Sequence, residues 1–307
     1  MEVTAQMVKA LRDLTGSGVM DCKKALIETE GDTDKAIEFL REKGLATAEK
    51  KAGRIAAEGV VNAIVDGDTK AVIVEVNSET DFVAKNDKFR TFVDDVTEQI
   101  MTTDVADVET LLASSWIKDA GKTVKEELSG QIAVIGENLS IRRFEKITAT
   151  NGIVVPYIHG GGRIGVLVQA ETTANTDAVK EALKNVAMQI AALYPKYVSR
   201  DEIAQDYIEH ETGILKAQAK NENPDKPDNI IDKMIVGRLN KQLKEVCLLD
   251  QSYVKDGDLT VAKYLEQVSK EAGADVKVVK FVRFETGEGI EKKEDNFAEE
   301  VAKAVQG

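Results

Sequence analysis

Three short segments of this sequence spell motifs that carry chemistry in other proteins. Gly121-Lys122-Thr123 matches the end of a P-loop, which binds the phosphates of a nucleotide. That motif needs a glycine five residues before Gly121, and the residue there is Trp116. The sequence therefore predicts that this chain does not hydrolyse GTP by itself.

The other two matches overlap in one glycine-rich segment. Gly160-x-Gly162-x-x-Gly165 has the spelling of a dinucleotide fingerprint, but a strand-like segment follows it, where such a site needs the N-terminus of a helix. His159-Gly160-Gly161-Gly162 spells an esterase oxyanion loop, yet the chain contains no Gly-x-Ser-x-Gly elbow. A hairpin turn accounts for both matches.

The remaining candidates for catalysis are few. His159 and His210 are the two histidines, and the abundant carboxylates form no pair on a recognisable catalytic scaffold. Cys22 and Cys247 have no second thiol or histidine at metal-ligand spacing, so both are expected to be reduced, buried residues. We expect no enzyme activity, no cofactor and no bound metal.

The composition describes an ordinary globular protein of two or three folded units. Of the 307 residues, 43% are hydrophobic and 31% are charged. The formal net charge of −13 disfavours a nucleic-acid partner, because nucleic-acid affinity rests largely on Lys and Arg side chains. The apolar runs are too short to span a membrane and no apolar signal core begins the chain, so a cytoplasmic protein is expected.

The first 54 residues, in which acidic and basic side chains balance, predict a small helical bundle. Apolar residues recur at helical spacing in three stretches, and glycines such as Gly16 and Gly31 separate them. Gly44 is expected to end the third helix. Residues 50–54 are expected to form a solvated linker.

From Gly59 the pattern changes to that of strands, and it then repeats. Residues 60–76 predict a β-hairpin, and a helix with an apolar face follows. Residues 152–169 predict a second hairpin, and a helix follows from about Asp177 to Leu193. An offset of 93 residues places Gly59 on Gly152 (152 − 59 = 93), so two related α+β subdomains are expected.

The segment from Asp201 to Val246 breaks the α+β pattern. Two helical stripes flank a polar turn that contains Pro224 and Pro227, which predicts an antiparallel helical hairpin projecting from the body. Such a hairpin usually closes on itself and in fewer cases seals a dimer. It should also be dispensable for folding of the body. Further expected elements are strands over Ser140–Phe144 and Val276–Glu285 and a helix over Phe297–Val305.

The expected fold class is therefore α+β, with five segments. These are a helical bundle with its linker (1–54), a first core subdomain (55–145), the first part of a second core subdomain (146–200), the helical hairpin (201–246), and the remainder of the second subdomain with a C-terminal module (247–307).

The segment from Glu75 to Lys85 follows the first hairpin directly. By local pattern, Phe82 and Val83 are core residues that cap the hairpin, and Asp81 is the N-cap of the next helix. The segment nevertheless closely resembles a signature of the elongation factor Ts family, the exchange factors of the translational GTPase elongation factor Tu.

Other segments extend this resemblance to essentially the whole chain. Leu11 to Leu26 resembles the second family signature, and further matches are Ile135 to Asn138, His159-Gly160 with Arg163 to Leu167, and Phe281 to Phe284 with Gly287 to Ile290. Two departures are Ser78-Glu79, where other members often carry Cys-Gln, and the glycine-rich turn at Gly161-Gly162.

The resemblance implies an N-terminal bundle like a ubiquitin-associated domain, two core subdomains, a coiled-coil hairpin and a C-terminal module. It also implies GDP release from elongation factor Tu, with Thr80 to Val83 acting in the removal of Mg²⁺ from the GTPase and Phe82 wedged between partner side chains. The residues implied to contact the GTPase are Val19, Met20, Thr80, Asp81, Phe82, Val83, Ile135, Gly136 and His159.

Two other functions remain open on the sequence. In one, the N-terminal bundle docks a partner helix and the body is scaffold; in the other, the chain accompanies RNA or the ribosome, which its charge disfavours. No membrane partner is expected. The oligomeric state also stays open, whether a dimer or a heterotetramer with the GTPase.

Overall fold

The structure, a computed structural model, describes residues 3–291 of the chain. These residues form two compact units. Unit 1 combines Met1–Asn62, Val74–Phe144 and the segment from Glu285, and unit 2 combines Ala63–Ile73 with Glu145–Phe284.

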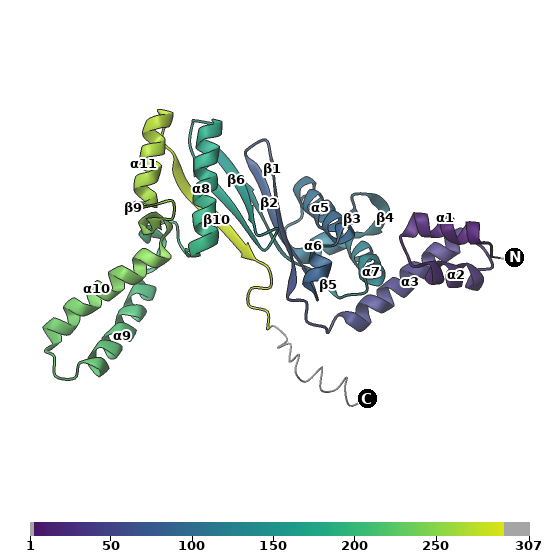
Figure 1. The fold of residues 1–307 in the computed structure, drawn as a ribbon, viewed down its shortest axis with the longest axis horizontal. Helices are drawn as coiled ribbons and strands as arrows, with labels where there is room; N and C mark the ends of the chain where they lie inside the picture. The colour runs from purple at the N-terminus through teal and green to yellow at the C-terminus, as the bar shows by residue number, and fades with distance from the viewer. Residues whose placement is uncertain (1–2, 292–307) are drawn as a thin grey trace. The chain divides into compact units, whose positions relative to one another are not determined.

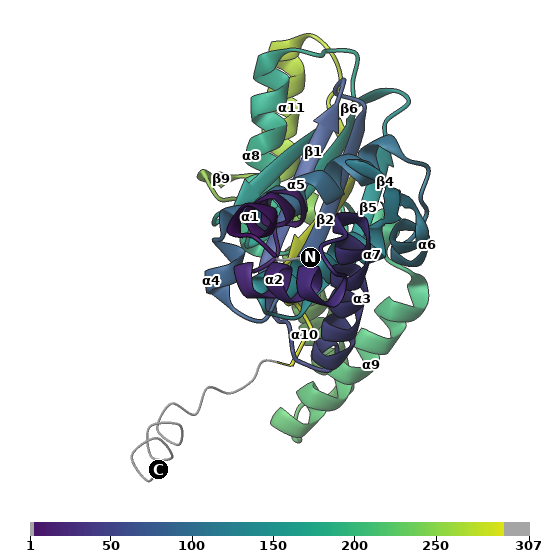
Figure 2. The same ribbon diagram turned by 90° about the vertical axis from the view of Figure 1, so that its right-hand side faces the viewer.

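Unit 1 begins with three helices, α1 (Ala5–Thr15), α2 (Val19–Glu28) and α3 (Thr33–Lys51). Figure 2 shows them grouped, and their shared core contains Leu11, Cys22 and Leu26. Side chains of Thr4 and Asp32 cap α1 and α3, because each accepts a hydrogen bond from a first-turn backbone N–H. The predicted three-helix bundle is thus present.

The rest of unit 1 carries a three-stranded sheet and several helices. The sheet has the order β1-β2-β5, from β1 (Glu58–Asp66), β2 (Lys70–Ser78) and β5 (Leu139–Thr148), and the tip of the β1–β2 hairpin is grouped with unit 2. The other elements are α4 (Asp81–Ala84), α5 (Asp87–Thr102), α6 (Val108–Ala113), β3 (Ser115–Trp116), β4 (Asp119–Thr123) and α7 (Val124–Ile135).

Unit 2 has a sheet of the order β10-β7-β6, with α8 lying against it (Figure 1). Its elements are β6 (Gly152–His159), β7 (Ile164–Glu171), α8 (Asp177–Leu193), α9 (Gln205–Glu222), α10 (Asp228–Val246), β8 (Ser252–Tyr253), β9 (Asp256–Thr260), α11 (Val261–Ala272) and β10 (Lys277–Glu285). The core of the unit joins α8 and α11 to the sheet, through residues such as Val168, Leu183 and Leu265.

The two hairpins are equivalent, as the offset predicts. Gly59 and Gly152 both have positive φ, +132° and +155°. Gly59 is the second residue of β1, and Gly152 is the first residue of β6. A Cβ added to Gly59 would lie 2.2 Å from the carbonyl oxygen of Val76, and one added to Gly152 would lie 1.9 Å from that of Ala170. Both glycines therefore permit a close approach of two strands that no other residue allows.

The repeat extends further than the sequence predicted. In unit 1 the small hairpin β3–β4 pairs Ser115 with Thr123 and leads into α7, and in unit 2 β8–β9 pairs Ser252 with Thr260 and leads into α11. In each unit a further strand, β5 or β10, then follows and forms the third strand of the larger sheet. Each unit therefore contains one copy of the same hairpin–helix–hairpin–helix–strand order.

A buried glutamine holds the small hairpin in each copy. Gln99 of α5 donates to the carbonyl of Ser115 at 3.0 Å and accepts from the N–H of Ile117 at 2.7 Å. Gln189 of α8 makes the same pair of bonds, to Ser252 at 3.0 Å and from Val254 at 2.8 Å. Since α9 and α10 lie between Gln189 and its hairpin, they form an insertion into the second copy.

The inserted arm closes on itself. α9 and α10 run side by side (Figure 1), and Ala219 packs with Ile231 and Ile235 between them. At the base, the N–H groups of Lys196 and Tyr197 both donate to the carbonyl of Val246, so the two ends of the insertion meet. The predicted pair of helices is present, while a coiled-coil geometry stays a prediction.

Replacing the arm between Ile203 and Leu243 with a short glycine linker should leave a folded protein. The outer part of the arm's apolar stripe is buried within the arm. Tyr207, Ile208 and Leu239 at the base cluster with Tyr197 and Cys247, and the ends of the insertion already meet at Val246. A calorimetric melt of the shortened chain should stay cooperative, with circular dichroism showing the loss of helix alone. Loss of the cooperative transition would show that the arm belongs to the core.

One helix boundary was predicted wrongly. Gly44 does not end the third helix, because α3 continues to Lys51 and takes in the first part of the expected linker. α3 packs on α7, and a Cβ added to Gly44 would lie 3.6 Å from the carbonyl oxygen of Ser129. Arg41 also donates from Nη2 to the carbonyl of Gly121 at 3.1 Å, so tertiary contacts overcome the low helix propensity of glycine.

The mixture of helices and small sheets confirms the α+β class. The glycine-rich segment that matches the dinucleotide and esterase motifs lies in the β6–β7 turn, where His159 pairs with Ile164. A hairpin turn was predicted here. Cys22 and Cys247 are free and buried. The helix predicted over Phe297–Val305 lies outside the described residues, and within residues 3–291 no helix combines the length and apolarity of a membrane span.

Candidate functional site

The segment singled out by the sequence forms a one-turn helix at the end of β2. Thr80, not Asp81, is the N-cap of α4: its side chain accepts a hydrogen bond from the N–H of Val83 at 3.4 Å. Asp81 lies in the first turn, where a negative charge favours the helix N-terminus. A separate cap, Asn86, begins α5. We refer to Thr80–Val83, after the role that the resemblance implies for it, as the exchange turn.

The exchange turn presents Phe82 to solvent. The Phe82 side chain is 79% exposed, whereas Ala84 faces the interior. The local interpretation of Phe82 as a core residue was therefore wrong. A large aromatic side chain held in water on this short turn is accessible to a partner protein.

Asp81 lies beside Phe82 and carries a stabilised negative charge. Lys85, four residues on, donates to its carboxylate at 2.6 Å, and this hydrogen bond lowers the pKa of the Asp81 carboxyl. The pair is exposed to solvent, so it adds little to stability. Its consequence is a defined acidic group beside the exposed aromatic ring.

Glu137 holds the exchange turn by its backbone and by its cap. One carboxylate oxygen accepts from the N–H of Thr80 at 3.0 Å, and the other accepts from the Thr80 hydroxyl at 2.6 Å. Hydrogen bonds to a charged acceptor are stronger than those between neutral groups. Glu137 follows α7, so the carboxylate joins the end of β2 to the turn after α7.

Glu79 makes the reciprocal connection. Its Oε1 accepts from the N–H of Asn138 at 2.6 Å and from Arg54 Nη1 at 3.4 Å. The Asn138 side chain in turn donates to the carbonyl of Arg54 at 2.8 Å. Three segments, at residues 54, 79–80 and 137–138, are thus bonded together beneath the exchange turn.

Ile135 and Gly136 lie in the turn that Glu137 and Asn138 tie to the exchange turn. Gly136 ends α7 with a φ of +87°, a conformation that glycine adopts without strain, and Lys51 donates to its carbonyl. Gly136 is exposed and Ile135 half-buried. The structure therefore brings Ile135 and Gly136 together with Thr80–Val83.

The other predicted contact residues lie elsewhere. Val19 and Met20 begin α2 and are 48% and 72% exposed. His159, at the end of β6 in unit 2, is exposed, and its Nδ1 is hydrogen-bonded to the Tyr157 hydroxyl at 2.9 Å. All three side chains are thus available to a partner.

The described residues hold no group of three or more His, Cys, Asp or Glu side chains that could bind a metal ion. The site presents an exposed aromatic ring and an adjacent carboxylate on a backbone that two glutamates hold by hydrogen bonds.

Glu79 and Glu137 were not predicted as functional residues. Their contacts join residues that are distant in sequence, which no local pattern reveals. The matched segment Ile135 to Asn138 contained Glu137, so the resemblance marked the segment without its role.

Comparison with known proteins shows the family to which the chain belongs. A family model described as "Elongation factor TS" matches residues 79–288, which begin at Glu79 beside the exchange turn. The match covers more than half of the chain, so the chain belongs to the elongation factor Ts family.

Individual relatives agree over nearly their whole length. The chain is 56% identical over 305 residues to the elongation factor Ts of Clostridioides difficile (strain 630), covering 99% of each chain. It is 54% identical over 304 residues to that of Clostridium novyi (strain NT), again covering 99% of each. It is 55% identical over 302 residues to that of Clostridium perfringens (strain ATCC 13124), covering 98% of each.

Proposed function

We propose that the chain acts in translation elongation as the guanine-nucleotide exchange factor of elongation factor Tu. The exchange turn presses Phe82 and Asp81 against the GTPase beside its nucleotide site, which disturbs the Mg²⁺ and phosphate contacts and releases GDP. The observation that carries this proposal is the 79% exposure of Phe82 on a turn that two glutamates hold in place.

The proposal needs no bond-making step on this chain. A translational GTPase holds GDP through P-loop dipoles, a lysine and Mg²⁺, so a displaced metal weakens nucleotide binding. Because coupling between two ligands is reciprocal, a factor that lowers nucleotide affinity is itself expelled when nucleotide rebinds. One molecule of the factor can then act on many GTPase molecules in turn, although none of its side chains takes part in a chemical reaction.

A stopped-flow measurement tests the function directly. Elongation factor Tu loaded with fluorescently labelled GDP is mixed with excess unlabelled GDP, with and without this protein. The release rate should rise with the concentration of the protein and then saturate. An unchanged release rate at saturating protein would exclude the exchange function.

A shortened chain distinguishes exchange from simple docking by the N-terminal bundle. A chain that begins at Gly53 lacks α1–α3 but keeps Arg54, whose carbonyl and side chain bond to Asn138 and Glu79. We expect it to need a higher concentration for half-maximal exchange, because Val19 and Met20 are gone. Its maximal rate should persist only in part, because α3 no longer packs on α7 and Lys51 no longer bonds to Gly136. Binding with no acceleration by the full-length chain would favour the docking function instead.

His159→Ala should weaken partner binding more than it weakens folding. The side chain is exposed in a glycine-rich turn, so its removal should change the unfolding free energy by less than about 0.5 kcal/mol. Titration of labelled elongation factor Tu should show reduced affinity. Wild-type affinity would instead make His159 an ordinary solvated turn residue.

A further inference from the structure

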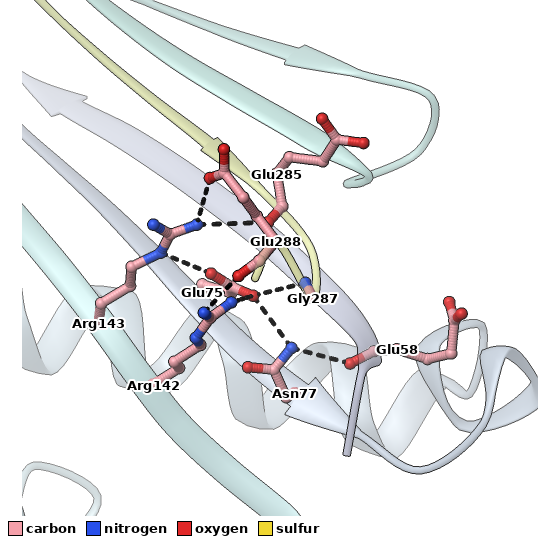
Figure 3. Close-up of polar contacts among 8 residues, drawn as sticks. All are labelled: Glu58, Glu75, Asn77, Arg142, Arg143, Glu285, Gly287 and Glu288. Atoms are coloured by element: carbon pink, nitrogen blue, oxygen red, sulfur yellow. Dashed lines mark hydrogen bonds and ion pairs between the residues drawn. The ribbon is translucent and has the colours of Figure 1, made fainter. Parts of the chain in front are cut away.

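A fully buried carboxylate lies on β2, shortly before the exchange turn. Glu75 is 0% exposed. Its Oε1 accepts from Asn77 Nδ2 at 3.0 Å, from Arg142 Nη1 at 3.0 Å and from the Gly287 N–H at 2.8 Å, and its Oε2 accepts from Arg143 Nε at 2.6 Å (Figure 3). A buried charge is tolerated only when it is paired and hydrogen-bonded in this way.

The same network fixes residues 285–290, which we call the C-terminal latch. Arg143 Nη2 donates to the carbonyl of Glu285 at 3.3 Å and to the Glu288 carboxylate at 3.1 Å. Arg142 Nη2 donates to the carbonyl of Glu288 (Figure 3). Two arginines of β5 therefore hold the latch from one side, while Glu75 of β2 holds its Gly287 N–H.

The latch also presses on the segment before β1. Gly287 has a φ of +73°, and a Cβ at this position would lie 2.0 Å from the carbonyl oxygen of Ala57. No other residue fits without moving one of the two backbones. The latch thus has one defined seat, made by Ala57, Glu75 and the two arginines.

The face of β2 that holds the latch leads directly to the exchange turn. Side chains two apart lie on one face of a strand, so Glu75 and Asn77 point the same way. Asn77 Nδ2 also donates to the carbonyl of Glu58 at 3.0 Å. Glu79, just beyond the end of β2, bonds to Asn138, and Thr80 follows at once. Glu75, Asn77 and Glu79 therefore hold the segment that leads from the latch to the turn.

We propose that Glu75 is a positioning residue for nucleotide exchange. It seats the C-terminal latch against β2 and β5, and the seated latch fixes the end of β2 from which Phe82 is presented. The inference rests on the exchange function proposed above. It differs from a purely structural role, in which Glu75 would stabilise unit 1 without affecting how the exchange turn acts.

Two substitutions in the full-length chain disturb the latch by different means. Glu75→Gln removes the charge that pairs with the arginines and leaves the side-chain shape. Gly287→Ala leaves every charge in place and forces the latch away from Ala57. Their controls lie in unit 2: Gln189→Leu removes another fully buried polar group, and Gly273→Ala places a side chain at a φ of +64° with open space around it.

Two measurements separate positioning from stability. Amide hydrogen exchange in the free protein, over residues 80–86, should be faster in both latch variants and unchanged in both controls. At saturating protein, the maximal rate of labelled GDP release from elongation factor Tu should fall about fivefold or more in the latch variants, the lower end of ordinary coupling factors. The concentration for half-maximal release should change little, because the exposed contact side chains are retained.

The opposite pattern would overturn the inference. If both latch variants melted at lower temperature yet kept wild-type amide exchange over residues 80–86 and a wild-type maximal rate per folded molecule, Glu75 would be structural alone. Failure of the exchange function looks different: the wild-type protein would not accelerate GDP release, while the amide measurement would still report whether the latch positions the turn.

Discussion

Phe82→Ala should abolish most of the acceleration of GDP release while the protein melts as the wild type does. The ring is 79% exposed, so its removal leaves no cavity and should change the unfolding free energy by no more than about 0.5 kcal/mol. Coupling energies between two ligands are typically about 1–3 kcal/mol. If half of this energy passes through the ring, the maximal exchange rate falls several-fold.

The neighbouring carboxylate provides a second arm of this experiment. Asp81→Ala should also slow exchange, and the double variant should lose less than the sum of the two single losses, since both side chains press on the same partner surface. Val254→Ala is a matched control, because Val254 is an exposed apolar residue of unit 2 with 48% exposure. A Phe82→Ala protein with a normal maximal exchange rate would sink the wedge mechanism.

The sequence predicted the elements whose apolar faces are long and regular. In α5, Phe89, Phe92 and Ile100 are all buried as the helical spacing requires, and α8 has the predicted bounds. Propensity misled at Gly44, because the packing of α3 on α7 prolongs the helix. That contact joins residues distant in the chain, so the sequence pattern around Gly44 could not reveal it.

The second half of the internal repeat escaped sequence reasoning for a related reason. β3 and β8 contain two residues each, and β4 and β9 are largely exposed and polar, so neither hairpin shows a strand pattern. Each hairpin is held by a buried glutamine of an earlier long helix, Gln99 of α5 or Gln189 of α8. A single Gln on an otherwise apolar helical face carries no signal of the hairpin that it holds.

The site was reached by resemblance, and local pattern alone would have misplaced it. α4 is one turn long, so periodicity could not decide which of its side chains faces inward, and the buried residue is Ala84 instead of Phe82. The groups that hold the turn, Glu79 and Glu137, bond to residues that are distant in sequence. These contacts become apparent only in the folded chain.

Glu137→Ala should reduce exchange almost as strongly as Phe82→Ala, although Glu137 itself need not touch the partner. The substitution removes the acceptor of both the Thr80 N–H and the Thr80 hydroxyl. Hydrogen bonds to charged groups contribute about 1.5–3 kcal/mol each, and water replaces part of this at a half-buried site. We expect a lower melting temperature and a severalfold lower maximal rate, with Glu137→Gln, which keeps one acceptor oxygen, lying between.

The comparison with Glu127 makes this prediction specific to the exchange turn. Glu127 lies on α7, where its carboxylate accepts a hydrogen bond from Gln131 at 2.7 Å and pairs with Lys122 at 2.5 Å. Glu127→Ala therefore also removes a carboxylate that makes two polar contacts. It should cost stability and leave the maximal exchange rate per folded molecule unchanged. If Glu137 acts by holding Phe82 in place, adding Glu137→Ala to Phe82→Ala should slow exchange little further. Equal losses of exchange in Glu137→Ala and Glu127→Ala would show instead that the turn responds to any loss of stability in α7.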